Sequence, residues 1–307
     1  MIDRSTYLSG LLMAGLGAIF FSTKAIFAKL LYQHGVDGVD VIALRMLLSL
    51  PVFLLILILS WGRGSRLRWH EYAQVMLLGV IGYYGSSTLD FVGLEFVSAG
   101  LERQILFLTP TLTLMLGMLV YRRRIGRRQV ASMLLAYAGI VLVFWHDTQL
   151  GGDNIVLGAV LVFAAALLYA VYLLLSGELV QRVGALRLVA LAMIGASVIS
   201  LLQFAVLRAP LSLLEQTPTV WGLSLLMATV ATILPVFLTM FAIARIGAET
   251  TSQASMLGPV STLFLAWWFL SEPITVLQIA GTLLVLAGIW LLSTHQPARE
   301  RAPVPGR

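Results

Sequence analysis

The sequence has no cysteine among its 307 residues, and only 11% of them are charged. The lack of cysteine excludes disulfides, thiolate metal sites, cysteine nucleophiles and palmitoylation. The low charge, with 59% hydrophobic residues and a mean hydropathy of +0.95, excludes an ordinary soluble globular protein. An integral membrane protein is therefore expected.

Motifs that would indicate an enzyme or a channel are missing as well. The sequence contains no HExxH, GxSxG or P-loop motif and no re-entrant segment for a selectivity filter. A net charge of +6 would suggest nucleic acid in a polar chain, but here the charges lie between long apolar runs. We expect no metal, no cofactor and no nucleic acid. A membrane-embedded enzyme and a non-transporting membrane scaffold are the distant alternatives to a transporter.

Apolar runs dominate what is present. A membrane-spanning helix takes about 20 apolar residues. The sequence predicts an all-α protein with ten such helices, at Tyr7 to Leu31, Val39 to Trp61, Glu71 to Phe91, Ser98 to Tyr121, Gln129 to Trp145, Ile155 to Gly177, Leu188 to Leu207, Thr219 to Ile243, Ala248 to Leu270 and Ile274 to Ser293. Residues 294–307 are polar, hold three prolines and are expected to be a disordered tail.

The basic residues predict the orientation, because Lys and Arg are retained on the cytoplasmic side. With the N-terminus inside, fifteen of the twenty Lys and Arg residues fall in inner segments and only Arg208 falls in an outer loop. The other four, Lys24, Lys29, Arg45 and Arg103, fall within helices. Both termini are therefore expected to be cytoplasmic.

An internal repeat appears when the chain is shifted by 149 residues. Residues 99–144 and 248–293 are then identical at 16 of 46 positions. The informative identities are Gln104 with Gln253, Pro110 with Pro259, Gln129 with Gln278, and Gly139 with Gly288. The repeats, 1–147 and 148–293, would hold five helices each, and an odd number inverts one repeat relative to the other. Inverted repeats are typical of alternating access to a central site.

The ends of the two repeats resemble a known family. IGRRQVASMLLAYAGIVLV (Ile125 to Val143) and SEPITVLQIAGTLLVLAGIWLL (Ser271 to Leu292) are similar to the last loop and helix of the EamA repeat, of the drug/metabolite transporter superfamily. The second copy has the family's acidic residue, Glu272, where the first has Arg123. The resemblance implies a ten-helix secondary transporter, commonly an exporter of amino acids or other metabolites in the bacterial inner membrane. The chain looks most like the bacterial aromatic amino acid exporters; an exporter or permease of another metabolite or drug is the alternative.

Charges within the helices need partners or a function, because a charge at the membrane centre costs roughly 2.5 to 3.5 kcal/mol on insertion scales. Lys24 is expected about 10 Å from the outer end of its helix. It either faces the cavity and binds substrate or forms a structural salt bridge with Asp90 or Glu102. Arg45 resembles an arginine near the start of the family's second helix. We interpret Arg45 as a charge partner of acids at similar depth: Asp37, Asp40 or Glu102.

The charged residues near the outer helix ends are expected either to have gating or interfacial roles or to contact the substrate, and gating is also expected at two prolines. Asp90, Glu102 and Arg103 lie near outer helix ends, and a coupling proton would have to bind Asp90 or Glu102. Pro110 and Pro259 should bend the fourth and ninth helices, because proline frees a backbone carbonyl.

Candidate substrate-binding residues gather near the expected midplane. Gln104 and Phe107 in the fourth helix have counterparts in Gln253 and Met256 in the ninth. The two amides would flank one cavity; alternatively, each glutamine bonds a neighbouring helix. The other candidates are Tyr83, Tyr84 and Ser87 in the third helix, and Tyr169 and Tyr172 in the sixth. Such a lining suits a small zwitterion with an apolar or aromatic side chain. The expected partners are this substrate, the lipid bilayer and, as an open question, protons. The oligomeric state is not predicted.

Overall fold

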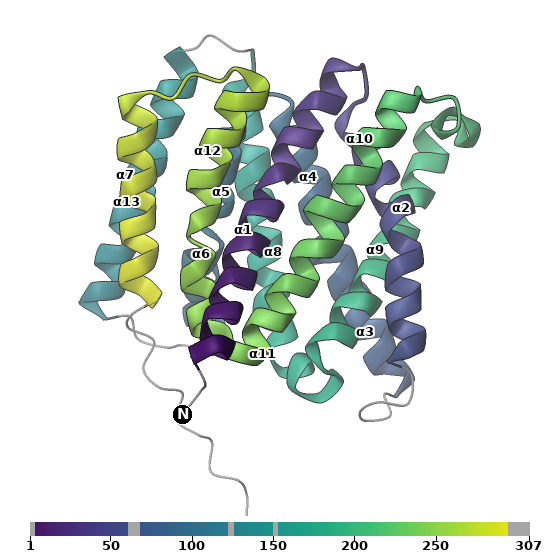
Figure 1. Ribbon diagram of the computed structural model, residues 1–307, viewed down its shortest axis with the longest axis horizontal. Helices are drawn as coiled ribbons and strands as arrows, with labels where there is room; N and C mark the ends of the chain where they lie inside the picture. Colours follow the sequence, from purple (N-terminus) through teal and green to yellow (C-terminus); the bar gives the residue numbers. More distant parts are fainter. Residues whose placement is uncertain (1–3, 61–67, 122–125, 150–152, 294–307) are drawn as a thin grey trace, which may run out of the picture.

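The computed structural model describes residues 4–60, 68–121, 126–149 and 153–293, and within these ranges it is a bundle of helices without a strand (Figure 1). Within these described ranges, eight helices are long and apolar enough to cross a membrane, and a shorter apolar helix covers Val276–Leu292. The predicted all-helical membrane protein is confirmed at this level. The expected tail, 294–307, lies outside the described residues.

The described part of the first half forms five helical spans, two of which are interrupted. The elements are α1 (Arg4–Gln33), α2 (Gly38–Leu59), α3 (Trp69–Gly79), the π-helix η1 (Val80–Gly85), α4 (Ser86–Leu94), α5 (Ala99–Leu106), α6 (Thr109–Tyr121) and α7 (Arg127–Gln149). Ser98 caps α5, its hydroxyl accepting the Leu101 N–H at 3.0 Å. Capping satisfies a backbone donor that the helix itself leaves free.

The second half has a similar order of elements. They are α8 (Ile155–Val183), α9 (Ala185–Leu207), η2 (Pro210–Leu213), α10 (Pro218–Ala228), the π-helix η3 (Thr229–Ile233), α11 (Leu234–Ala254), α12 (Leu257–Leu270) and α13 (Val276–Ser293). This half has an additional 3-10 helix, η2, and one interrupted helix, α11, where the first half has α4 and α5. Gly247 interrupts α11 with φ 79° and ψ 163°. Such a positive φ is accessible to glycine at little cost, so the expected eighth and ninth helices meet at this residue.

Irregular helix segments recur at a spacing close to 149 residues. The two π-helices begin at Val80 and Thr229. The break between α5 and α6 follows Leu106, and the break between α11 and α12 follows Ala254. Pro110 lies in the first turn of α6, and Pro259 in the first turn of α12. Proline fits a first turn because it has no N–H to donate.

Helices α7 and α13 pack side by side at one edge of the bundle (Figure 1). A Cβ built on Gly139 would lie 2.5 Å from the Gly281 carbonyl oxygen, and one built on Gly281 would lie 2.6 Å from that of Gly139. Further along, the Ser132 hydroxyl donates to the Gly288 carbonyl at 2.6 Å. Residue numbers increase along α7 as they decrease along α13, so the two helices are antiparallel.

Candidate functional site

A buried triad of charges joins three helices. Lys24 of α1 binds Asp90 of α4, and its Nζ lies 2.7 Å from Glu102 Oε1 of α5. The three side chains are 6%, 5% and 0% exposed. Buried ion pairs offset their desolvation only when they are well paired. The structure therefore contains the salt bridge that one of the two interpretations of Lys24 describes.

Arg45 of α2 lies close to this triad. Its Nη2 donates to Ser87 Oγ at 2.8 Å, and its guanidinium carbon lies 5.0 Å from the centre of the Phe91 ring. Lys24 Nζ lies 5.4 Å from the centre of the same ring. Phe91 therefore has two cations near it, an arrangement that cation–π attraction favours.

The carboxylates expected to pair with Arg45 lie elsewhere. Asp37 binds Arg208, and Asp40 Oδ1 lies 3.8 Å from Arg208 Nε. Glu102 binds Lys24. Among the ion pairs of residues 4–60, 68–121, 126–149 and 153–293, none involves Arg45. The interpretation of Arg45 as a paired charge therefore needs correction: Arg208 takes the acids at the start of α2, and Arg45 binds a hydroxyl.

Arg103 is the third buried cation. Its guanidinium carbon lies 4.9 Å from the ring centre of Phe21 and 5.3 Å from that of Phe107. Gly258 of α12 packs on it so closely that a Cβ there would lie 2.5 Å from Arg103 Nη2. Arg103 thus contacts the second half of the chain. Both arginines are as buried as Lys24, although the sequence indicated depth only for Lys24.

Three of the predicted tyrosines form an aromatic cluster between η1 and α8. The ring centre of Tyr83 lies 6.2 Å from that of Tyr169 and 5.1 Å from that of Tyr172, and the last two stack at 5.7 Å. Gly82 permits this packing, since a Cβ there would lie 2.3 Å from Tyr172 Cγ. Tyr84 packs instead against a group of buried residues from α2 and α9. A π-helix in a membrane segment often marks a functional position.

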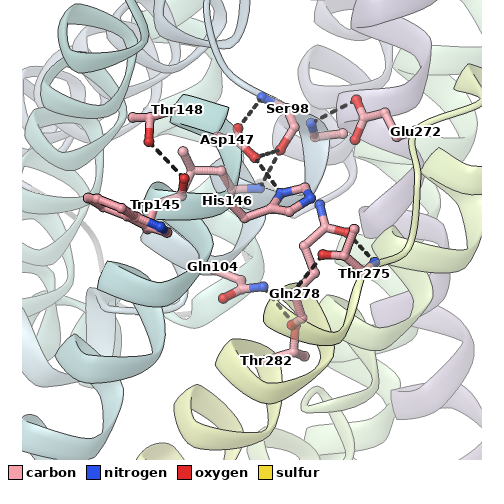
Figure 2. Close-up of polar contacts among 12 residues, drawn as sticks. Ser98, Gln104, Trp145, His146, Asp147, Thr148, Glu272, Thr275, Gln278 and Thr282 are labelled. Carbon is pink, nitrogen blue, oxygen red and sulfur yellow. Dashed lines mark hydrogen bonds and ion pairs between the residues drawn. The ribbon is translucent and has the colours of Figure 1, made fainter. Parts of the chain in front are cut away.

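No hydrogen bond among the described residues joins the two glutamines. Gln104 is 1% exposed, and its Nε2 donates to Thr282 Oγ1 of α13 at 2.7 Å (Figure 2). Gln253 and Met256 are half-buried beside the break between α11 and α12. The contact of Gln104 corresponds to the alternative in which a glutamine bonds a neighbouring helix.

A polar network at the end of the bundle where α5 begins was not predicted (Figure 2). Asp147 accepts the Ser98 backbone N–H and hydroxyl, both at 2.9 Å, and Glu272 accepts the Ala99 N–H at 3.1 Å. His146 Nδ1 lies 3.5 Å from Asp147. The helix dipole of α5 favours these carboxylates. Burial raises the pKa of Glu272, against the effect of the Ala99 hydrogen bond. The sequence marks Ser98 as an N-cap residue, but it does not indicate the carboxylates that bind there, because they lie far along the chain.

Ion pairs and a depression lie at the two ends of the bundle. Arg182 pairs with Glu71 at 2.6 Å, and Arg187 donates to Tyr72 at 2.6 Å, both at helix ends expected to be cytoplasmic. At the other end, a depression of about 320 Å³ is lined by Tyr32, Gly35, Val36, Asp37 and Glu95. None of its lining residues belongs to the predicted substrate site.

Comparisons with known proteins agree with this architecture. The family model described as "EamA-like transporter family" matches residues 8–145 and again 156–294. The "Uncharacterized transporter YcbK" of Bacillus subtilis (strain 168) is 30% identical over 308 residues, covering 95% of this chain and 94% of the relative. A "Probable amino-acid metabolite efflux pump" of Salmonella typhimurium (strain LT2) is 27% identical over 248 residues, covering 76% and 82%. A solved structure described as "Crystal structure of protein" has a TM-score of 0.65 at 17% identity, covering 97% and 99%, which shows the fold alone.

Proposed function

Because the chain belongs to the EamA-like transporter family, we propose that it is a secondary transporter that exports amino acids with apolar or aromatic side chains. The Salmonella relative, named as an amino-acid metabolite efflux pump, supports this substrate class. The tyrosine cluster of η1 and α8 supports it as well, since aromatic rings pack well on apolar and aromatic side chains. The alternative is export of another metabolite or drug.

The proposed topology has ten crossings in two inverted halves, 1–147 and 148–293, with both termini in the cytoplasm of a bacterial cell. The contacts between α7 and α13 support it. Under the 149-residue shift, Ser132 corresponds to Gly281 and Gly139 to Gly288. The shift therefore converts the Gly139–Gly281 contact into the Ser132–Gly288 contact, and the reverse. Reciprocal contacts of this kind are characteristic of a two-fold axis. Helix α1 begins and α13 ends at the same end of the bundle (Figure 1).

The recurrence of helix irregularities is the observation that carries the proposed mechanism. Each half has a π-helix and a break before a proline at equivalent positions. Breaks in membrane helices are tolerated where they are buried or line a cavity, and inverted repeats with such breaks rock around a central site. In this mechanism, the breaks before Pro110 and Pro259 open opposite sides in turn.

Energy coupling separates two versions of this proposal. A coupling proton would bind Asp90 or Glu102, which flank Lys24. Protonating either carboxylate would weaken its ion pair, so proton binding and helix movement would be linked. Facilitated diffusion needs no such link. An imposed pH gradient would then leave the steady-state distribution of the substrate across the membrane unchanged.

Reporter fusions test the topology. Fusions after Gln33, Val97 and Gly152 are expected to report the outside, because the inner segments then keep the basic residues. Fusions after Arg68 and Arg182 serve as the cytoplasmic controls. Cytoplasmic activity at any two of the first three positions would contradict both the topology and the inverted repeat.

Counterflow in proteoliposomes tests the function. Labelled phenylalanine and leucine are expected to enter liposomes preloaded with unlabelled amino acid, with saturation and trans-stimulation, because alternating access exchanges bound substrates. A sugar phosphate should not enter, since a phosphate requires several cationic groups that are free to bind it. Transport of the phosphate without either amino acid would overturn the proposed substrate class.

A further inference from the structure

Five of the buried charged side chains of the first half form one cluster around Lys24, because Arg45 shares the Phe91 ring with Lys24 and Arg103 shares the Phe21 ring. The charges of this cluster do not balance. Lys24, Arg45 and Arg103 are cations, Asp90 and Glu102 are carboxylates, and each is at most 6% exposed. Both carboxylates bind Lys24, and the ion pairs of the described residues include neither arginine. An unpaired charge is costly inside a membrane and marks a functional position. The cluster has one cation in excess and can accept one anionic group.

The two unpaired arginines differ in what surrounds them. Arg103 lies near the rings of Phe21 and Phe107 and against Gly258. Both arginines have a buried Nε without a hydrogen-bond partner, but Arg45 has one ring beside it and a single bond, to Ser87. A guanidinium has five N–H donors, so Arg45 retains donors for a ligand.

The position of Arg45 connects the charge cluster with the aromatic cluster. Tyr83, Ser87 and Asp90 follow one another at intervals of four and three residues, which places them along one face of a helical segment. Arg45 binds Ser87, the middle of the three. It therefore lies between Asp90, which binds Lys24, and Tyr83, which packs on Tyr172.

We propose that Arg45 binds the carboxylate of the transported molecule, whose apolar or aromatic side chain packs against Tyr83, Tyr169 and Tyr172. The ligand class is a carboxylic acid with an apolar or aromatic side chain; an α-amino acid is the member that the proposed function names, and the inference rests on that function. A guanidinium holds a carboxylate through two parallel hydrogen bonds, from Nε and an adjacent Nη. The unpartnered Nε of Arg45 supplies one of these donors.

Three labelled compounds test the subsite by counterflow in proteoliposomes: phenylalanine, phenethylamine, which lacks the carboxylate, and 3-phenylpropanoate, which lacks the amine. The wild-type protein is expected to transport phenylalanine at least about tenfold faster than phenethylamine, because a site that pairs with a missing group rejects the analogue. Arg45→Gln should lower phenylalanine transport about tenfold and leave phenethylamine unchanged, which removes the preference. Arg245→Gln is the matched control, because Arg245 also lies over a phenylalanine ring, at 5.8 Å, but on the surface.

The outcomes separate the subsite from the proposed function. A preference for phenylalanine that persists in Arg45→Gln overturns the subsite alone. Arg45-dependent transport of 3-phenylpropanoate without phenylalanine supports the subsite and overturns the amino-acid proposal, and transport of neither acid overturns both. If Arg45→Gln does not fold, Ser87→Ala, which removes one bond to Arg45, should raise the KM for phenylalanine and not for phenethylamine. An unchanged KM for phenylalanine overturns the subsite.

Discussion

Replacing Lys24 by methionine is expected to cost about 3 to 5 kcal/mol of the free energy of unfolding, because it leaves two buried carboxylates without their cation. Asp90 and Glu102 both bind Lys24, and neither is more than 5% exposed. Asp90 belongs to α4 and Glu102 to α5. Losing the two ion pairs therefore also weakens the packing of α1 against both helices. Thermal unfolding in detergent and the yield of folded protein measure the effect.

Two comparisons show whether charge is the cause. Lys29→Met removes a half-buried lysine from the outer part of the same helix and should change the unfolding temperature much less. Adding Asp90→Asn and Glu102→Gln to Lys24→Met removes the two carboxylates that lose their cation and should recover part of the lost stability, while Arg45 and Arg103 keep their charges. A triple variant as unstable as the single variant would show that Lys24 acts through packing.

The membrane fold could be predicted because it depends on composition along the chain. Long apolar runs determine where helices cross, and the positions of Lys and Arg predict orientation. The irregular segments were harder to predict. Pro110 and Pro259 indicated bends, but the breaks come just before them. The interruption of α11 at Gly247 falls between the predicted eighth and ninth helices, although its positive φ was not predicted. The π-helices depend on side-chain packing between distant helices.

The candidate site was predictable as a set of residues and less so as a set of contacts. A salt bridge of Lys24 with Asp90 or Glu102 was one of two interpretations of Lys24, and the structure contains both ion pairs. The predicted partners of Arg45 were wrong, because Arg208 binds the acids at the start of α2. Arg208 lies 171 residues from Asp37 in the sequence, so only the fold brings the two together. Asp147 was missed for the same reason, as its bonds to Ser98 join the end of α7 to the start of α5.

The contact between α7 and α13 provides the second large effect. Gly139→Ala and Gly281→Ala should each cost about 1 to 3 kcal/mol of the free energy of unfolding, because each new Cβ meets the other helix's carbonyl oxygen at 2.5 to 2.6 Å. Backbone cannot move aside as a flexible side chain can, so the helices must separate. Separation would also lengthen the 2.6 Å bond from Ser132 to Gly288.

The controls are two helix glycines with open space around them. Gly177 of α8 and Gly222 of α10 have no atom within 4 Å of an added Cβ, so alanine there should be neutral or stabilise the helix by up to about 1 kcal/mol. The double variant Gly139→Ala with Gly281→Ala should cost less than the sum of the single variants, because one separation of the helices relieves both clashes. Equal stability of all four single variants in thermal unfolding would contradict the close approach of α7 and α13, and strictly additive costs would show that the two glycines do not share one contact.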